Sequence, residues 1–351
     1  MGGVPAGIST IMSRQNAANR PSRATMVDVA RDAGVSLKTV SRVINGEAGV
    51  SPTTVANVLA VATALRYERN DLAASLRQGT RSHTLGLVIE DLANPFYSAI
   101  AQAVEESARA RDSLLITGSA REDPSREREL VGALLRRRVD ALLIVPAGPD
   151  HRYVAASGFE SRAVFLDRPP AKTRADTVLT DNEASSRRAV AHLIGHGHTR
   201  IAFVGDDLRL YTARGRLAGY RRAHSAGGLT IDPELVSVGN GTAEAAERAV
   251  AALMSRPPSR RPTAIFTGNN RCTVGTLRAL GPARDRIALV GFDDFELAEL
   301  LGVTVVRTDP YRIGRLGAQL AFERIDGEDG KPRRVVVSAD LVRRGSGEIA
   351  P

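Results

Sequence analysis

The sequence predicts a small all-α head followed by a larger α/β body made of two lobes. Three observations support this prediction. Residues 26–45 have the pattern of two short helices joined by a tight turn. From residue 84 onward, runs rich in Val, Ile and Leu alternate with helical patterns, which is typical of parallel sheets covered by helices on both faces. The chain of 351 residues is also long enough for a head and one or two lobes with their own cores.

The first motif, MVDVARDAGVSLKTVSRVIN at residues 26–45, is predicted to be a helix-turn-helix. Val27 and Val29 lie on the expected apolar face of its first helix, together with the alanine that follows. Gly34 supplies the left-handed residue of the turn, and Ser36 is a natural N-cap for the second helix.

The second helix of this motif leaves a mixed polar and apolar face open. Val40 and Val43 recur three residues apart and are expected to face the core. The open face then carries Leu37, Lys38, Ser41, Arg42 and Asn45. Such a helix suits direct reading of base edges in a DNA major groove. An ordinary helical hairpin in a larger core is the alternative, but the basic surroundings near the N-terminus favour DNA binding.

Between head and body, residues 70–82 form a short connecting segment. Residues 70–78 are too few to hold a helix alone in water, yet they are rich in helix-forming residues. This combination predicts a hinge helix that forms on a partner, with a plain linker as the alternative. Residues 1–24, rich in Gly, Ala, Ser, Asn and Arg, are expected to be a disordered tail.

The body is predicted to alternate strands and helices. Strands are expected at residues 85–91, 113–119, 140–147, 163–168, 176–181, 200–206, 235–239, 263–269, 286–294, 303–310 and 333–344. Helices are expected at residues 95–111, 124–138, 183–197, 212–227, 242–256, 271–280 and 295–302. Two sheets of similar size predict an N-lobe at about 83–179 plus 308–332 and a C-lobe at about 180–307 plus 333–351.

Ligands of open α/β sheets bind at the carboxyl ends of the strands, so polar residues there are candidates. One helix begins after Asn94 and places two aromatic residues at this edge. The candidate residues are Phe96, Tyr97, Asp167, Arg168, Arg216, Asn269 and Asp293. Arginine, asparagine and aspartate match vicinal hydroxyls, and an aromatic ring covers the apolar face of a sugar. A structural role fits any single one of them as well, but the set favours a ligand site.

Composition narrows the function. The net charge is +9, and residues 1–82 hold ten Arg or Lys against five Asp or Glu, which suits a basic head on a nearly balanced body. The single cysteine, Cys272, fits a reducing cytoplasm. The sequence has neither a run of about 18 apolar residues nor the apolar core of a signal peptide, so a membrane location is not expected.

Motifs of catalysis are missing from the sequence. It contains no Gly-rich phosphate loop, nucleophile elbow or Ser/His/Asp grouping, and no acid/base partner is placed beside Asp293 and Asp294. His192, His196 and His198 lie close in sequence, but no carboxylate or cysteine completes a metal site. We therefore expect no enzyme activity, no metal and no cofactor.

The head resembles that of the lactose-repressor (LacI/GalR) family of bacterial transcription regulators. DVARDAGVSLKTVSRVIN carries the resemblance, followed by Asn45-Gly46 and by VSPTTVANVLAVATALRY, which is similar to the family's third helix. The resemblance extends from Thr25 to Arg344. It departs at Arg69, where the family usually has proline, and at Asn270, where it usually has aspartate.

The resemblance implies a body like the periplasmic binding proteins, a homodimer, a near-palindromic operator DNA and an effector, a sugar or sugar derivative, between the lobes. It implies DNA contacts from Thr25, Ser36, Leu37, Lys38, Thr39, Ser41, Arg42, Asn45, Ser51, Asn70 and Leu76. Leu76 takes the place of a leucine that wedges into the central base step of the operator. The expected function is a DNA-binding repressor whose operator affinity is controlled by the effector. A sugar-binding or sugar-processing protein and an architectural DNA binder are the alternatives.

Overall fold

The computed structural model describes residues 24–67 and 81–351, which belong to two separate units, a head and a body. The predicted tail at 1–24 lies outside the described residues except for residue 24. The predicted hinge at 70–82, with Asn70 and Leu76, lies outside them except for residues 81 and 82.

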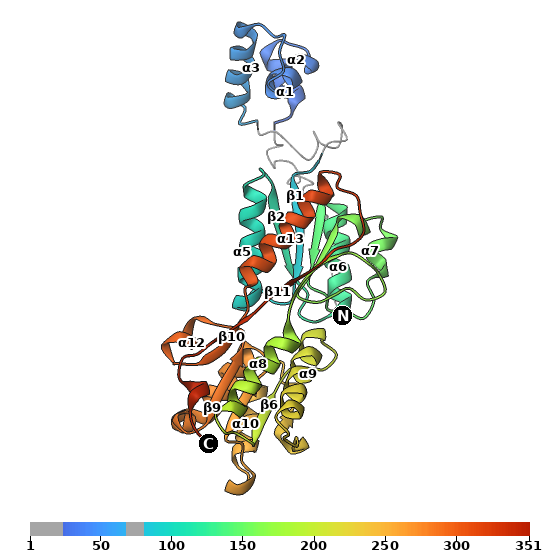
Figure 1. The fold of residues 1–351 in the computed structure, drawn as a ribbon. Helices are drawn as coiled ribbons and strands as arrows, with labels where there is room; N and C mark the ends of the chain where they lie inside the picture. Colours follow the sequence, from blue (N-terminus) through green and yellow to red (C-terminus); the bar gives the residue numbers. More distant parts are fainter. Residues whose placement is uncertain (1–23, 68–80) are drawn as a thin grey trace, which may run out of the picture. The chain divides into compact units, whose positions relative to one another are not determined.

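The head is a bundle of three helices (Figure 1). These are α1 (Met26–Ala33), α2 (Leu37–Ile44) and α3 (Pro52–Ala64). Each begins at a hydroxyl side chain that accepts a bond from the first turn: Thr25, Ser36 and Ser51. Thr25 forms a capping box with Asp28, and Gly34 ends α1 at a φ of 68°, as a left-handed turn residue.

A small apolar cluster holds the head together. Val29, Val40, Val43 and Val58 are buried in it, which confirms the predicted inner face of α2. Val27 was expected on the inner face of α1, but 61% of its surface is exposed. It lies two residues from Val29, about 200° around the helix axis, and therefore on the opposite side.

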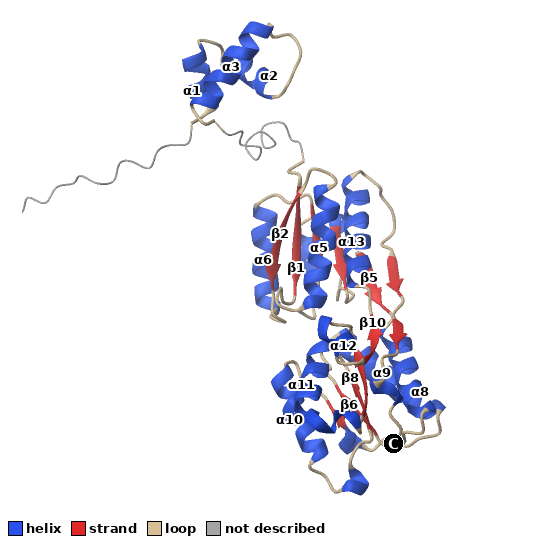
Figure 2. Cartoon of the chain, turned by 90° about the vertical axis from the view of Figure 1, so that its left-hand side faces the viewer, coloured by secondary structure: helices blue, strands red, loops and turns tan. Residues whose placement is uncertain are grey.

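The body contains two six-stranded sheets, which define its two lobes (Figure 2). The N-lobe sheet has the order β11-β5-β4-β3-β1-β2, and all its pairs are parallel. Its strands are β1 (Thr84–Ile89), β2 (Leu114–Ser119), β3 (Ala141–Ile144), β4 (Ala163–Leu166), β5 (Asp176–Thr180) and β11 (Arg334–Val337). The C-lobe sheet has the order β12-β10-β9-β8-β6-β7, and only β12 is antiparallel. Its strands are β6 (Ile201–Val204), β7 (Val236–Ser237), β8 (Ala264–Thr267), β9 (Ala288–Phe292), β10 (Thr304–Arg307) and β12 (Asp340–Val342).

Helices cover both faces of each sheet, as the alternating pattern predicts (Figures 1 and 2). The N-lobe helices are α5 (Pro95–Arg109), α6 (Pro124–Arg136), α7 (Arg152–Ala156) and α13 (Pro310–Ile325). The C-lobe helices are α8 (Asn182–Gly195), α9 (Tyr211–Ala226), α10 (Ala243–Met254), α11 (Asn270–Leu280) and α12 (Glu296–Leu300). In the N-lobe, α5 and α13 share one apolar cluster while α6 and α7 share another. In the C-lobe, α8 and α9 pack on one face while α10, α11 and α12 contribute to the cluster on the other.

The helices α8 and α9 approach closely because Gly219 of α9 has no side chain. A Cβ at this position would collide with the carbonyl oxygen of Glu183 and would lie 2.7 Å from the Cβ of Ser186. The close packing of this pair therefore depends on glycine.

The chain crosses between the lobes three times, after β5, after β10 and after β11. The predicted domain boundary placed residues 333–351 in the C-lobe. This boundary is wrong, because the chain crosses to the C-lobe only after β11. The strand β11 pairs with β5 in the N-lobe, and only β12 and the residues after it belong to the C-lobe. The two strands are separated by two residues within the single strand predicted at 333–344, so the sequence pattern did not show that they join different sheets.

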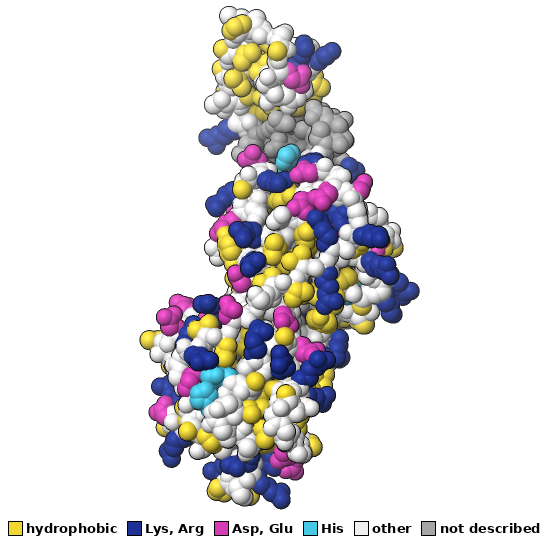
Figure 3. All heavy atoms as spheres, in the orientation of Figure 1, with side chains coloured by type: hydrophobic (Ala, Val, Ile, Leu, Met, Phe, Trp, Pro, Cys, Tyr) yellow, Lys and Arg dark blue, Asp and Glu magenta, His cyan; other side chains and the backbone are white. Residues whose placement is uncertain are grey.

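Acidic, basic and apolar side chains are mixed over the face of the body that Figure 3 shows. No helix in residues 24–67 or 81–351 is both long and apolar enough to cross a membrane.

Candidate functional site

The outer face of α2 presents side chains that can reach a partner. Leu37 is 43% exposed, and Lys38 next to it is exposed as well. One turn later, the guanidinium of Arg42 lies 3.6 Å from the carboxylate of Glu47, and its side chain is 43% exposed. The Asn45 amide donates to the same glutamate over 3.2 Å. Glu47 therefore holds two of the predicted DNA-reading side chains at the end of α2.

Three of the other predicted DNA-binding residues of the head cap helices in the structure. The hydroxyls of Thr25, Ser36 and Ser51 accept bonds from backbone N–H groups at the three helix starts. Thr39 is half-buried and shares a hydroxyl bond of 2.9 Å with Ser36, while Ser41 is half-buried on α2. The structure thus places Thr25, Ser36 and Ser51 at helix N-termini, where backbone N–H groups are also available to a phosphate.

The two lobes enclose a cavity of about 40 Å³ at the carboxyl ends of their strands. Every predicted effector residue lines this cavity: Phe96, Tyr97, Asp167, Arg168, Arg216, Asn269 and Asp293. The rule that strand ends carry the ligand site therefore located one cavity from residues spread over both lobes.

Two aspartates occupy equivalent positions in the two lobes. Asp167 follows β4 and Asp293 follows β9, the third strand from the same edge in each sheet. Both have left-handed backbones, with φ of 63° and 67°. The N–H of Asp167 donates to the carbonyl of Val178 over 2.8 Å, and that of Asp293 donates to Val306 over 3.0 Å. These bonds to the next strand hold both carboxylates at the edge of the sheet.

In the N-lobe, Asp167 keeps one oxygen without a partner. The Tyr97 hydroxyl lies 3.3 Å from one carboxylate oxygen, whereas the other is buried and accepts no bond. Arg168 bonds to the same hydroxyl over 3.2 Å and binds Glu122 through two bonds of 2.6 and 2.7 Å. The buried Nε of Arg168 makes no hydrogen bond, although it lies 3.6 Å from the Asp167 carboxylate oxygen that Tyr97 contacts. Burial raises the pKa of Asp167, although Arg168 and Arg216 oppose this rise.

In the C-lobe, Arg216 bonds to three neighbouring groups. It donates to the side-chain oxygen of Asn182 over 2.8 Å and to the carbonyl of Gly268 over 2.5 Å. Its Nη1 also lies 3.3 Å from the Asp293 carboxylate, and its guanidinium stacks 3.9 Å above the Phe292 ring centroid. Arg216 was predicted to face a ligand, and in this structure it also ties α8, α9 and two strand ends together.

Asn269 is also used within the protein. Its oxygen accepts the N–H of Cys272 over 2.7 Å and caps α11, and its amide donates to Asp206 over 3.1 Å. Asp206 follows β6 and was missed in the sequence, although the strand-end rule that found Asp167 and Asp293 applies to it equally.

Five further residues join the lobes directly at this edge, and none was predicted as a site residue. Arg271 of α11 donates to Glu90 over 3.0 Å and to Asp91 over 2.6 Å. Asn270 donates to Asn94 over 2.9 Å. Sequence patterns gave only partial signals here: Glu90 and Asp91 are the last two residues of the strand predicted at 85–91, whereas β1 ends at Ile89, and Asn270 is a departure from the family pattern.

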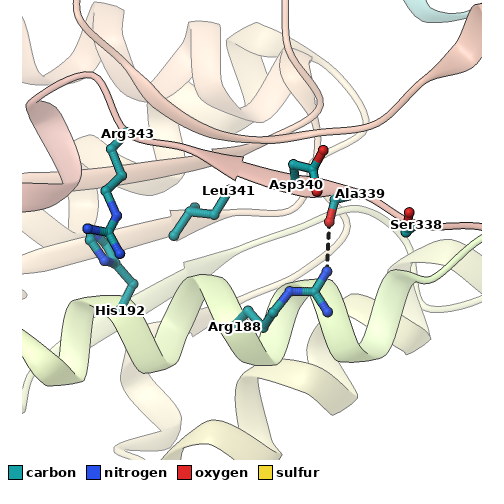
Figure 4. A pocket seen from close by; sticks show the side chains of 7 residues that line it. All are labelled: Arg188, His192, Ser338, Ala339, Asp340, Leu341 and Arg343. Atoms are coloured by element: carbon teal, nitrogen blue, oxygen red, sulfur yellow. Dashed lines mark hydrogen bonds between the residues drawn. The ribbon is translucent and has the colours of Figure 1, made fainter.

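A second hollow lies between α8 and β12, and none of the predicted site residues lines it (Figure 4). Its lining residues are Arg188, His192, Ser338, Ala339, Asp340, Leu341 and Arg343. Arg188 reaches across it and donates to the Ala339 carbonyl over 2.7 Å. This bond fastens the last crossing of the chain to α8, so we assign it a structural role.

The histidines of the C-lobe have structural partners. His192 lies 2.7 Å from a carboxylate oxygen of Glu348, and His198 lies 2.7 Å from the carbonyl of Ile349. Burial lowers the pKa of His192, His198 and His224. In the part of the chain that the structure describes, no three His, Cys, Asp or Glu residues form a group that could hold a metal ion.

Comparison with known proteins agrees with this arrangement. Residues 25–70 match the lacI family of bacterial regulatory proteins, and residues 190–347 match a periplasmic binding protein-like domain. The ribose operon repressor of Escherichia coli (strain K12) is 34% identical over 331 residues, which cover 92% of this chain and 99% of that repressor. The chain belongs to the lacI family.

Solved structures of family members share its fold. The Lac repressor dimer bound to operator and the anti-inducer ONPF superposes with a TM-score of 0.80 at 26% identity, covering 93% of this chain and 99% of that one. The complex of the transcriptional regulator CelR with cellobiose has a TM-score of 0.68 at 30% identity, covering 93% of this chain and all of the other. The predicted family and fold are therefore confirmed: this lacI-family chain is a DNA-binding transcriptional regulator, and its relatives are repressors rather than enzymes.

Proposed function

We propose that this lacI-family regulator is a repressor controlled by a small, uncharged, polyhydroxylated effector of the carbohydrate class, enclosed between the lobes. The unpartnered carboxylate oxygen of Asp167, buried at the cavity, is the observation that carries this proposal. A buried acceptor of this kind is costly unless a donor reaches it, and a ligand hydroxyl supplies such a donor.

The charges around the cavity favour a neutral ligand. Five carboxylates line it, from Glu90, Glu122, Asp167, Asp206 and Asp293. Only three arginines accompany them, and each already has a carboxylate partner. These carboxylates would therefore repel a phosphate or carboxylate group on the effector. Such a group would also find no arginine in the cavity that lacks a carboxylate partner. A sugar hydroxyl can instead donate to a carboxylate and accept from the Nε of Arg168, which makes no hydrogen bond within the protein.

Aromatic residues complete the site. Phe96 and Tyr97 line the cavity and meet edge to face, with ring centroids 5.0 Å apart. Rings of this kind cover the apolar face of a sugar. We propose no further cofactor, because the polar groups present serve binding rather than group transfer.

Calorimetric titration of the full chain tests the effector class. D-Ribose, D-glucose and D-galactose are compared with ribose 5-phosphate and glucose 6-phosphate. We expect one neutral sugar to bind and its phosphate ester to bind at least about tenfold more weakly, a difference of about 1.4 kcal/mol. Tighter binding of a phosphate ester would overturn the proposal.

Asp167→Asn provides the matching variant. It keeps the size of the side chain but replaces the free acceptor, so the affinity for the sugar is expected to fall about tenfold or more. Asp340→Asn is the control, because Asp340 lines the second hollow between α8 and β12. Equal losses in both variants would mean that the cavity is not the effector site.

For DNA, we propose that α2 lies in the major groove of each operator half-site. Leu37, Lys38, Ser41, Arg42 and Asn45 face the bases or nearby phosphates. Thr25, Ser36, Thr39 and Ser51 contact phosphates at the helix N-termini. We propose that Asn70 and Leu76, outside the described residues, contact the minor groove. Selection of genomic fragments at physiological salt tests this, and binding without sequence preference would favour an architectural role instead.

We propose that the regulator acts as a homodimer on a near-palindromic operator, in the bacterial cytoplasm where the chromosome lies. Exposed apolar side chains support self-association: Leu114 and Ile116 on the edge strand β2, and Leu297 and Leu300 on α12. Sedimentation velocity is expected to show dimers, and Leu114→Glu combined with Leu300→Glu to show monomers. If the wild-type protein sediments as a monomer at micromolar concentration, the proposal of a homodimer is overturned.

A further inference from the structure

Three direct side-chain bonds join the lobes at one edge of the cavity. They run from Arg271 to Glu90 and Asp91, and from Asn270 to Asn94. We name these five residues the interlobe latch. The first pair of bonds is charged, and the asparagine pair is buried, with 9% and 6% of its surfaces exposed.

The latch lies far from the segments on which the lobes turn. The chain leaves the N-lobe after β5 and after β11, at one edge of the sheet. The strand β1, which ends before Glu90, is three strands away from β5. Neighbouring strands are about 4.8 Å apart, so the latch is about 14 Å from the crossing at β5. Because rotation of the lobes separates groups most where they are far from the axis, bonds here resist opening strongly.

The surroundings make these bonds stronger than ion pairs on an open surface. The side chain of Glu90 is 13% exposed, that of Asp91 27% and that of Arg271 30%. Partial burial reduces screening by water, and charged hydrogen bonds are the stronger class. By comparison, the bond of 3.2 Å between Arg334 and Tyr211, which also links the lobes, is exposed.

We propose that the interlobe latch holds the lobes closed before the effector arrives and thereby sets how tightly the effector binds. The latched cavity of about 40 Å³ is far smaller than ordinary ligand pockets of about 300–1,000 Å³, so the lobes must separate before a sugar fits. A ligand that binds only the opened form has an apparent Kd equal to its intrinsic Kd divided by the open fraction, and the latch lowers that fraction. The consequence for effector affinity depends on the proposed function above, whereas the closure is a property of the body alone.

The distance between the lobes, measured by electron–electron double resonance on the full chain without ligand, tests the latch. Nitroxide labels are attached at Glu129→Cys on α6 and Arg248→Cys on α10, both exposed. The native Cys272 is fully buried, so its thiol is shielded from the label. The wild-type latch is expected to give mainly one short distance. Arg271→Ala is expected to raise the ratio of open to closed molecules about fivefold or more.

Arg278→Ala is the matched control. Arg278 lies on the same helix, and its ion pair of 3.2 Å with Glu244 stays within the C-lobe. This variant is expected to leave the distance distribution unchanged. Arg271→Lys, which keeps the charge but not the two-pronged geometry, is expected to give an intermediate ratio. Because Arg271 is partly exposed, circular dichroism should show native folding in each variant.

Identical distance distributions in wild type and Arg271→Ala would overturn the latch. A sugar titration separates this outcome from the proposed function. Binding of a neutral sugar with no change of distances in Arg271→Ala would remove the latch alone. Opening in Arg271→Ala without binding of any sugar tested would remove the effector class alone.

Discussion

Replacing Arg216 by alanine is expected to destabilise the body as well as to alter effector binding. Arg216 is 5% exposed, and its guanidinium donates to Asn182, Gly268 and Asp293 over 2.8, 2.5 and 3.3 Å. Alanine would leave the buried Asp293 carboxylate with the hydroxyl of Thr308, 3.0 Å away, as its remaining side-chain donor. Breaking a buried ion pair in this way costs about 3–5 kcal/mol, because one charge stays buried without its partner.

Urea unfolding of the full chain, followed by far-ultraviolet circular dichroism, measures this loss. We expect a lower midpoint with an unchanged dependence on urea, since the surface exposed on unfolding stays similar. Asp293→Asn removes the charge but keeps the shape, so its cost is expected to be smaller, about 1–3 kcal/mol. The combination of Arg216→Met with Asp293→Asn is expected to cost at least about 1 kcal/mol less than the sum of the single changes.

The opposite result would refute this reasoning. If Arg216→Ala unfolds within about 0.5 kcal/mol of wild type, which is the usual range of surface substitutions, the ion pair does not stabilise the fold. If the variant also loses its effector response while keeping its operator affinity, Arg216 acts as a ligand contact and not as a structural tie.

Three further predictions concern the head, the packing of α9 and pH. Arg42→Ala is expected to lower operator affinity at least about tenfold in fluorescence anisotropy, with an unchanged melting temperature, whereas Arg31→Ala on α1 changes it little. Gly219→Ala is expected to lower the melting temperature, because overpacking against backbone atoms costs about 1–3 kcal/mol while alanine in a helix gains about 1. Gly195→Ala, with nothing within 4 Å of the added Cβ, should instead keep or raise it. Because burial lowers the pKa of His198, stability is present above the ordinary histidine pKa of 6.5 and is lost as pH falls below it. Urea unfolding between about pH 7.5 and 5 should show this loss, and His198→Gln should reduce its slope; a slope unchanged by that substitution would assign the loss to other groups.

Local patterns were sufficient for the head and for the order of strands and helices. The positions of caps and turn residues, such as Ser36 and Gly34, depend on backbone geometry over a few residues, and a single sequence displays them directly. The facing of Val27 was predicted wrongly because hydrophobicity identifies an apolar residue but not the side of the helix on which it lies.

Pairings between distant segments were harder to predict. The strand β11 was assigned to the wrong lobe because its run of valines fits either sheet, and only its pairing with β5 decides. The strand-end rule found Asp167 and Asp293, since chain order alone places them at the cavity. It could not show that Arg216 is bonded to Asp293, or that Arg271 reaches the other lobe, because both contacts require the folded positions of separate strands and helices.

The threefold crossing of the chain also has a consequence for biosynthesis. The N-lobe sheet is complete only when β11, at Arg334–Val337, has joined β5, and β12 then closes the far edge of the C-lobe sheet. The nascent chain must therefore hold most of both lobes with one edge strand missing until residues 334–342 leave the ribosome. Loss of about twenty residues from the C-terminus would remove an edge strand from both sheets at once, so a chain truncated during synthesis cannot complete the body. The head, whose core lies within residues 26–67, can fold long before that point, and a truncated chain would still carry it.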